Sequence, residues 1–472
     1  MLFNSFAFLV FLPLVFVGYW WLFRTLRAQN VFIIAVSYLF YGWWDWRFTI
    51  LLFLSSMSDY GFGLFINAQD EARKRKRALL LSLVFNLGIL AFFKYFNFFI
   101  DSTAELLRTL GMHPNLWSLR VILPVGISFY TFQSMSYTIE VYRRNFKPVR
   151  DPLAYLAFVS FFPHMIAGPI MRAVDLLPQF MRPRVFDYKK ARDGARQMLW
   201  GFFKKIVIAD QCAPLVDRIF GLDPATTPGV TLFFGAVFFA FQIYGDFSGY
   251  SDIAIGCARF FGIDLMRNFN YPYFSRSIGE FWRRWHISLS SWLRDFVYVP
   301  LGGNRDPKRR TRNILVTFVV SGLWHGANWT FVGWGLLHGL YHVPGTLVGV
   351  QKPQGHPELR DLPRMLWTFM LVLLGWVLFR AATVHAAWRH VRYTLGNALL
   401  SPGDLIAHVW RPEMLLILVM LTAEWRSRRE AHALVHVPGM AALRWVLYFV
   451  LVLTILLNVD LHTRHAFIYF RF

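Results

Sequence analysis

The sequence contains little charge and almost no cysteine for its length. Only 16% of its 472 residues are charged, whereas 56% are hydrophobic. Soluble domains of this size are usually less hydrophobic, so the composition excludes an ordinary soluble protein. The two cysteines, Cys212 and Cys257, lie in or near apolar segments. They provide neither a disulfide framework nor a zinc site, and we expect no bound metal.

The sequence also lacks the common signatures of soluble enzymes. It contains no HExxH motif, no Walker loop, no dinucleotide fingerprint and no GxSxG elbow. There is no internal repeat and no low-complexity tract, and the polar breaks are short. We therefore expect one membrane domain over residues 1–472, without a soluble domain.

Apolar sequence is abundant instead. Many stretches reach or approach the roughly 20 residues that a helix needs to cross a bilayer. We expect an all-α, polytopic bundle of about ten to twelve hydrophobic elements, a few of them re-entrant. The clearest runs are residues 2–23, 31–45, 78–100, 121–142, 231–258, 313–342, 363–380, 413–424 and 443–459. Shorter or interrupted runs are 48–66, 152–171 and 198–216.

The sequence has a formal net charge of +22, and its basic residues lie beside these apolar runs. Basic residues gather in short loops at 24–27, 73–77, 143–150, 182–196, 305–312 and 426–429. This positive-inside pattern predicts that the loops are cytoplasmic in a bacterial inner membrane. The sequence has no basic groove with interleaved aromatic residues of the kind that binds single strands, so we expect no nucleic-acid partner.

The same rule predicts where the two ends of the chain lie. No basic residue precedes the first apolar run, and Arg24 and Arg27 follow it directly. We therefore expect an uncleaved helix with a periplasmic N-terminus. One run, 443–459, follows the last basic loop, so the tail at 460–472 should also be periplasmic.

Residues 259–312 do not match a simple helical hairpin, because arginines alternate with aromatic residues. Arg283 and Arg284, for example, stand between Trp282 and Trp285. Such composition is typical of a membrane interface, so we expect amphipathic helices on or dipping into the cytoplasmic face. A purely structural anchor and a surface that binds an anionic donor both fit this composition.

Polar groups inside apolar runs are expensive and usually functional. Gln242, Asp246 and Asp252 interrupt one such run, whose glycines would let neighbouring backbones approach closely. His325 lies in the middle of another, at 313–342.

Burial lowers the pKa of a histidine, and a neutral imidazole is what a general base requires. A packing histidine bonded across helices is the alternative for His325. The same two alternatives apply to His286, where neighbouring arginines also oppose protonation. For His164, His338 and His342 a packing role is the expectation.

Five segments resemble the membrane-bound O-acyltransferase family, in its alginate O-acetylation branch. They are MLFNSFAFLVFLPLVFVGYW, FFPHMIAGPI, QIYGDFSGYSDIAIG, NFNYPYFSRSIGEFWRRWHISLSSWLRDFVYVPLGG and VSGLWHGANWTFVGWGLLHGLY. The resemblance covers most of the chain, and the blocks at 269–303 and 320–341 are the most specific. The branch also includes proteins that serve cellulose, peptidoglycan and teichoic acid. His164 stands where the family usually has glutamine, and we assign it no role.

The resemblance implies a helical bundle with re-entrant and interfacial helices around a transmembrane tunnel, and a catalytic core at 267–342. The paired histidines of the family match His286 and His325, with His325 as catalytic base. Acetyl-CoA would be a co-substrate from the cytoplasm rather than a bound cofactor. Partners would be a periplasmic acetyltransferase and a polysaccharide synthase complex. Residues expected at the donor site or tunnel are Arg283, Arg284, Trp285, Trp324, Asn328, Asp246 and Asp252.

The chain ends in HAFIYFRF, which resembles the F-I-Y-x-x-F ending of the small membrane partner in teichoic acid D-alanylation. We infer that Tyr469 is a candidate covalent acyl carrier. A phenol has a pKa of about 10, so a tyrosyl ester keeps more transfer potential than an alkyl ester. An aromatic anchor at the membrane interface is the alternative.

Two other classes of function remain open from the sequence. In a secondary transporter, Asp246 and Asp252 would be coupling residues, although the repeated halves common in transporters are absent. In a scaffold of a polysaccharide export complex, the histidines would only pack. The sequence does not specify the polymer; cellulose and alginate are the leading candidates.

Overall fold

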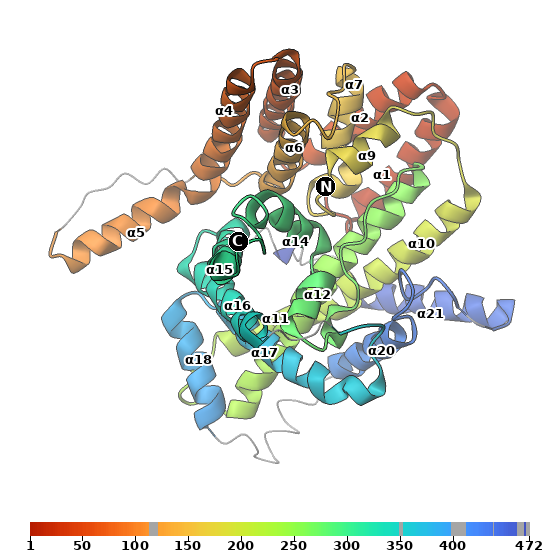
Figure 1. The fold of residues 1–472 in the computed structure, drawn as a ribbon. Coiled ribbons are helices and arrows are strands. Elements are labelled where there is room, and N and C mark those ends of the chain that lie inside the picture. Colours follow the sequence, from red (N-terminus) through yellow and green to blue (C-terminus); the bar gives the residue numbers. More distant parts are fainter. Residues whose placement is uncertain (113–120, 349–352, 398–411, 438, 460–466, 469–472) are drawn as a thin grey trace. The chain divides into compact units, whose positions relative to one another are not determined.

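The computed structural model describes residues 1–112, 121–348, 353–397, 412–437, 439–459 and 467–468. Regular structure in these ranges is helical and includes no strand, as the sequence predicts (Figure 1). The helices form two compact units. One contains Met1–Gly194 and Cys257–Met266, and the other contains Ala195–Gly256 and Arg267–Phe472. The single membrane domain expected from the sequence stays a prediction.

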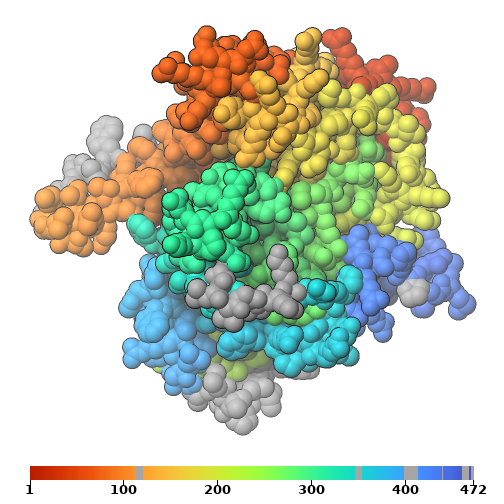
Figure 2. Space-filling model, viewed as in Figure 1, coloured from red at the N-terminus to blue at the C-terminus, as the bar shows by residue number. Residues whose placement is uncertain are grey.

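The first unit is built mainly from α3, α4, α6 and α7, with α2 packed on α7. Its elements are α1 (Phe6–Val17), the π-helical η1 (Gly18–Leu22), α2 (Leu26–Gly42), α3 (Arg47–Ala68), α4 (Ala72–Leu90), the π-helical η2 (Ala91–Tyr95), α5 (Phe96–Thr109), α6 (Ile127–Tyr142), α7 (Pro152–Ser160), α8 (Phe162–Met165), α9 (Ala173–Phe180) and the start of α10 (Tyr188–Phe202). Figure 2 shows α5, in orange, projecting from the other helices of this unit.

The second unit contains the segments that carry the sequence motifs. Its elements are the end of α10, the π-helical η3 (Phe203–Ala209), α11 (Asp210–Phe220), most of α12 (Gly229–Phe260), the 3-10 turn η4 (Pro272–Phe274), α13 (Ile278–Arg284), α14 (Ile287–Leu293), the π-helical η5 (Arg294–Tyr298), α15 (Pro307–His325), α16 (Trp329–Val348), the 3-10 turn η6 (Leu359–Asp361), α17 (Leu362–Arg380), α18 (Val384–Gly396), α20 (Pro412–Arg426) and α21 (Ala441–Asn458). The helices α15, α16 and α17 pack in sequence, and α13 lies against α16 and α17.

Five helical stretches in the described residues are long and apolar enough to cross a membrane, which agrees with a polytopic protein. They are Arg47–Ala68, Ala72–Thr109, Gly229–Phe260, Leu359–Arg380 and Ala441–Asn458, and Phe6–Leu22 is a shorter apolar stretch. Some of the other predicted runs are interrupted. The run at 152–171, for instance, contains the short helices α7 and α8.

Two boundaries differ from the sequence interpretation. The run at 313–342 is two helices rather than one, so His325 lies at the end of α15 and not in the middle of a helix. The polar break at 302–312 is partly helical, because the Asp306 side chain caps the N–H of Lys308 and Pro307 occupies the first turn.

Glycines allow two pairs of helices in the second unit to touch through their backbones. A Cβ on Gly322 of α15 would lie 2.2 Å from the carbonyl oxygen of Phe331 in α16. A Cβ on Gly249 of α12 would lie 2.7 Å from the carbonyl oxygen of Gly201 in α10. Small residues at such contacts are typical of helix packing in membranes, as the glycines of 242–256 predict.

Candidate active site

His286 is held by an unusual backbone turn. Its φ of 44° is in the left-handed region, at the residue that precedes α14. The N–H of Ile287 donates to the carbonyl oxygen of Asn268 at 2.8 Å, which ties the turn to the segment after α12. Such a backbone costs about 1–3 kcal/mol for a residue other than glycine, and these conformations cluster at functional sites.

The same asparagine determines which nitrogen of His286 carries the proton. The Oδ1 of Asn268 accepts from the Ser288 hydroxyl at 2.9 Å, and its Nδ2 donates to the Ser251 hydroxyl at 3.1 Å. Because Oδ1 is the acceptor, Nδ1 of His286, 3.1 Å away, must donate to it. Burial lowers the pKa of His286 to about 3, so the ring is neutral. Nε2 therefore carries the lone pair.

His325 ends α15 inside an aromatic cage, where its side chain is buried. The ring centroids of Trp324, Trp334 and Phe379 lie 5.0, 4.9 and 5.5 Å from that of His325. These rings exclude water from the imidazole, which strengthens any electrostatic or proton-transfer interaction made there.

The residue after His325 must be small for this cage to close. A Cβ on Gly326 would lie 2.1 Å from the ring of Phe331, which occupies the space of a side chain. Phe331 in turn packs edge-on against Phe379. The glycine of the WHG sequence therefore serves the packing around the histidine.

The structure brings together the two histidines that the sequence indicated. Their ring centroids are 6.4 Å apart, and Trp324 contacts both rings. Phe247 of α12 packs edge-on against His286, with 4.6 Å between the two ring centroids. The separation is too long for a direct hydrogen bond between the rings but fits two groups acting on one small substrate.

A pocket of about 480 Å³ lies between α13, α14, η5, α15 and α16, and neither His286 nor His325 is among its lining residues. Ile314, Thr317 and Ser321 line it along one face of α15, and His325 is the next residue on that face. Arg283 supplies positive charge to its wall, whereas the guanidinium of Arg294, which also lines the pocket, is paired with Asp295 at 2.6 and 3.1 Å. The pocket can thus accommodate a long molecule with an anionic end at Arg283.

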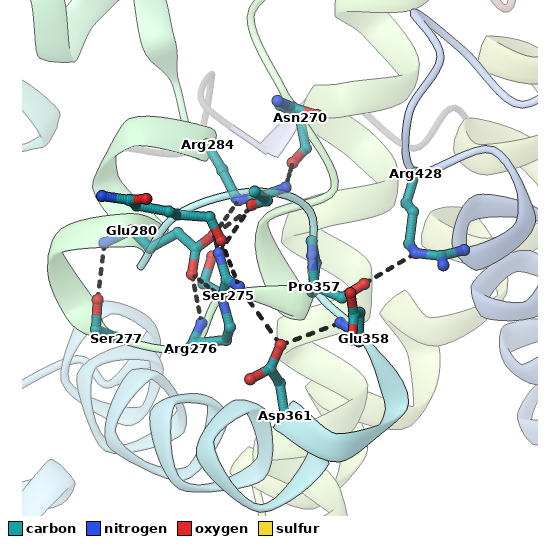
Figure 3. A network of polar contacts seen from close by, with 12 residues as sticks. Asn270, Ser275, Arg276, Ser277, Glu280, Arg284, Pro357, Glu358, Asp361 and Arg428 are labelled. Atoms are coloured by element: carbon teal, nitrogen blue, oxygen red, sulfur yellow. Dashed lines mark hydrogen bonds and ion pairs between the residues drawn. The ribbon is translucent and has the colours of Figure 1, made fainter. Parts of the chain in front are cut away.

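The adjacent Arg284 has different surroundings from Arg283. Its guanidinium is buried, donates to Glu280 at 2.8 and 3.1 Å, and donates to the carbonyl oxygen of Asn270 at 3.1 Å (Figure 3). Arg276 donates to the same Glu280 at 3.0 Å and to Asp361 at 3.4 Å. The predicted donor role of Arg284 stays a prediction, since these contacts support a structural role.

The network displaces the pKa of Glu280. Burial by itself would raise the pKa of Glu280, but hydrogen bonds from Arg276 and the nearby charge of Arg284 outweigh it. The net result is a pKa below the usual value of a glutamate. Arg428 joins the same region by donating to the carbonyl oxygen of Pro357 at 2.9 Å (Figure 3).

The two carboxylates of α12 lie in buried ion pairs. Asp252 accepts from Lys204 at 2.6 Å and from Gln197 at 2.7 Å. Asp246 lies 2.6 Å from Lys205, which also contacts Asp210 at 2.7 Å.

Sequence reasoning missed both lysines, because they lie in the uncertain run at 198–216. It also missed Glu424, whose carboxylate accepts from the Tyr244 hydroxyl at 2.9 Å. Charge inside an apolar run was the signal that could have identified all three.

Asn328 and Trp285, which were also expected near the donor, make capping and packing contacts, and their role at the donor site stays a prediction. The Oδ1 of Asn328 accepts from the N–H of Thr330 at 2.9 Å and so caps α16. Trp285 is fully buried against Trp376, at 4.9 Å between centroids. No group of three or more metal-binding side chains in the described part of the chain is placed to hold a metal ion.

Two residues of the C-terminal tail, at 467–468, lie beside Asp246 and Phe247 of α12. Phe467 and Ile468 are buried, and the ring of Phe467 lies 4.9 Å from Tyr250 and 5.7 Å from Phe247. The N–H of Ile468 donates to Oδ2 of Asp246 at 2.6 Å. Tyr469 itself lies outside the described residues.

Comparisons with known proteins agree with these features. The family model of membrane-bound O-acyltransferases matches residues 33–353. A "probable alginate O-acetylase" of Pseudomonas aeruginosa is 44% identical over 82% of this chain and 74% of that protein. A peptidoglycan O-acetyltransferase of Helicobacter pylori is 35% identical over 84% of this chain and 80% of that protein.

A more distant relative has a different acyl group in its name. The teichoic acid D-alanyltransferase of Streptococcus thermophilus is 29% identical over 54% of this chain and 68% of that protein. The extent of the family match and the identity to the first two relatives are sufficient to place the protein. The chain belongs to the membrane-bound O-acyltransferase family and is an acyl-transferring enzyme.

Proposed function

We propose that the protein transfers acetyl groups from cytoplasmic acetyl-CoA across the bacterial inner membrane for O-acetylation of an exopolysaccharide. The observation that carries the proposal is the pair of buried histidines, with 6.4 Å between their ring centroids, of which His325 lies one helical turn beyond the pocket residue Ser321. The relatives named for alginate and peptidoglycan O-acetylation support acetyl as the group transferred. Alginate and cellulose are the candidate polymers.

The pocket suggests how the donor binds. The nucleotide end of acetyl-CoA is anionic and would pair with Arg283 at the pocket wall. Its thioester arm would follow the face of α15 from Ile314 towards Ser321 and His325, a rise of roughly 16 Å along the helix. The basic residues at the start of α15 are consistent with a cytoplasmic entrance.

In the proposed reaction, His325 acts as general base. It takes the proton from the phenol of Tyr469, and the phenol oxygen forms a new bond to the acetyl carbonyl carbon. The carbon–sulfur bond of the thioester breaks, and the protonated His325 returns the proton to the sulfur, so CoA leaves as a thiol. His286 positions the thioester by packing beside it, because the lone pair on its Nε2 can accept a hydrogen bond but a thioester has no donor.

Tyr469 as carrier rests on its neighbours in the chain. Phe467 and Ile468 are buried against α12, and Phe467 contacts the same Phe247 that covers His286. A carrier is needed because no CoA or ATP recharges an acyl group outside the cell. We propose that a periplasmic acetyltransferase, associated with the polysaccharide synthase complex, receives the acetyl group from it. Both ends of the chain would then be periplasmic.

A transporter or a scaffold subunit is the alternative. Asp246 and Asp252, the candidate coupling residues of a transporter, are each paired with a lysine, which favours a structural or positioning role over ion coupling. Labelled acetyl-CoA supplied to the cytoplasmic face of everted vesicles separates the classes. Acetyl transfer without precursor uptake supports the enzyme, and uptake of an intact precursor supports the transporter.

The experiment that tests the catalytic proposal is His325→Ala. A general base contributes about 10²–10⁴-fold, so polymer acetylation should become undetectable while the protein is still inserted at its normal level. The matched control is His390→Gln, since His390 is also buried but bonds the carbonyl oxygen of Leu232. Full acetylation in His325→Ala, or equal loss in both variants, would overturn the assignment.

The carrier is tested separately by Tyr469→Phe, which removes only the phenol oxygen. A carrier should lose all polymer acetylation, whereas an aromatic anchor should tolerate the change. Wild-type acetylation in this variant would return Tyr469 to an anchoring role and leave the assignment of His325 standing.

A further inference from the structure

Asp246 shares its lysine with a second carboxylate. Lys205 lies between two carboxylates, 2.6 Å from Asp246 and 2.7 Å from Asp210. The neighbouring carboxylate on α12, Asp252, pairs with a different lysine, Lys204, at 2.6 Å.

The C-terminal tail supplies a second donor to Asp246. Oδ1 of Asp246 faces Lys205, and its other oxygen, Oδ2, accepts the backbone N–H of Ile468 at 2.6 Å. A hydrogen bond to an ionised carboxylate is about twice as strong as a neutral one. Because the donor is the backbone, the contact sets the position of the chain at residue 468 whatever side chain that residue carries.

Aromatic contacts fix the direction of the tail next to this bond. The ring of Phe467 lies between Tyr250 and Phe247, which are one turn apart on α12. Phe247 also packs edge-on against His286. One ring therefore separates the tail from the histidine site.

We propose that Asp246 is a positioning residue that docks the C-terminal tail reversibly through the N–H of Ile468, so that the residue after it is delivered to the histidines. This inference rests on the proposed carrier function and explains how a tail joined to the last helix can find one register. A single charge-assisted hydrogen bond with ring contacts holds the tail yet can be broken, as a carrier requires in order to pass on its acyl group.

Docking can be measured without any acyl transfer. In the full-length protein with Cys212→Ala and Cys257→Ala, the substitution Ile468→Cys keeps the backbone N–H and places one thiol at the dock. A small maleimide should label it slowly, because residue 468 is buried. Adding Asp246→Asn should speed labelling at least tenfold. Asp252→Asn, which disturbs the neighbouring pair on the same helix, should leave labelling slow.

A second set of variants removes the donor instead of the acceptor. Ile468→Pro deletes the N–H, and Ile468→Val, which keeps it, is the reference. If Asp246 acts through this N–H, Asp246→Asn combined with Ile468→Pro should lower polymer acetylation no further than Ile468→Pro alone. If Asp246 instead acts structurally through Lys205, the losses of polymer acetylation caused by the two substitutions should multiply in the combined variant.

Two outcomes would overturn the proposal. One is slow labelling at residue 468 in Asp246→Asn, and the other is multiplying losses in the combined variant. If Asp246→Asn does not fold, the proposal is tested by maleimide labelling of Phe467→Cys instead. This labelling should be faster in the Ile468→Pro background than in the Ile468→Val background. Failure of the carrier in Tyr469→Phe would be distinguishable, because it leaves labelling at the dock unchanged.

Discussion

Residues 267–298 and helix α21 are both rich in aromatic and apolar residues, but they lie in opposite environments. Phe281, Trp285 and Trp292 of the first segment are at most 4% exposed. In α21, which has a mean hydropathy of 2.0, only 11% of the apolar window is buried, and Phe449 is 67% exposed. The first segment is packed inside protein, and the second presents its side chains outward.

The backbone explains this difference. A regular helix satisfies its own N–H and C=O groups, so α21 can face lipid. The first segment has helices of only seven residues and left-handed turns at Tyr271 and His286. Its backbone groups bond to one another across the segment, as when the N–H of Asn270 donates to the carbonyl oxygen of Arg284 at 2.9 Å. Such irregular backbone is stable in the protein interior only where its polar groups are satisfied, and the site is built in this segment.

The largest expected effect is in the buried segment, from Glu280→Gln. The change leaves Arg276 and Arg284 buried without their shared carboxylate, which should cost about 3–5 kcal/mol. The measurement is thermal unfolding of the detergent-purified protein. In Glu71→Gln, where the ion pair with Lys74 is exposed, the change should stay within about 1 kcal/mol.

The same network should depend on pH. The pKa of Glu280 is lower in the folded protein, so its contribution is complete above the unfolded value and is lost as pH falls through the folded value. The wild type should therefore lose stability on acidification below the usual glutamate range, and Glu280→Gln should lack this part of the loss. Parallel pH curves for the two proteins would contradict the prediction.

On α21 we expect the next largest effect, from Phe449→Arg. A charge at the centre of a helix that faces lipid costs about 2.5–3.5 kcal/mol, so insertion should fall clearly. Phe449→Leu, which stays apolar, should insert normally. Measured by membrane-integrated protein per cell, normal insertion of the arginine variant would mean that this face is covered by protein or water instead of lipid.

The smallest expected effect concerns Arg283, which is exposed at the pocket although its neighbour Arg284 is buried. Arg283→Gln should raise KM for acetyl-CoA up to about tenfold, or about 1.4 kcal/mol, with kcat nearly unchanged. Arg429→Gln removes an exposed arginine outside the pocket and controls for general charge. Equal effects of the two would show that Arg283 makes no specific contact with the donor.

Some residues of the site could be predicted from short stretches of the sequence. His325 was recognisable because ionisable groups are rare in apolar sequence, and His286 because it matches the family's paired histidines. The glycines of α12 predicted close backbone contact. Lys204 and Lys205 were missed because a lysine in an apolar run resembles a loop residue until its buried carboxylate is known. The roles of Arg283 and Arg284 could not be separated either, since both have the same chemistry in the sequence.

By itself, the sequence determined that the chain is a membrane protein of helices, and which family motifs it carries. These properties depend on composition, on the length of apolar runs and on residues close together in the chain. Only the tertiary structure decided that His286 and His325 share one aromatic cage, that Arg284 is buried beside Glu280, and that Ile468 reaches Asp246. Contacts between distant segments depend on how the helices pack. The sequence pattern shows which positions are apolar, but it does not show which helices face one another.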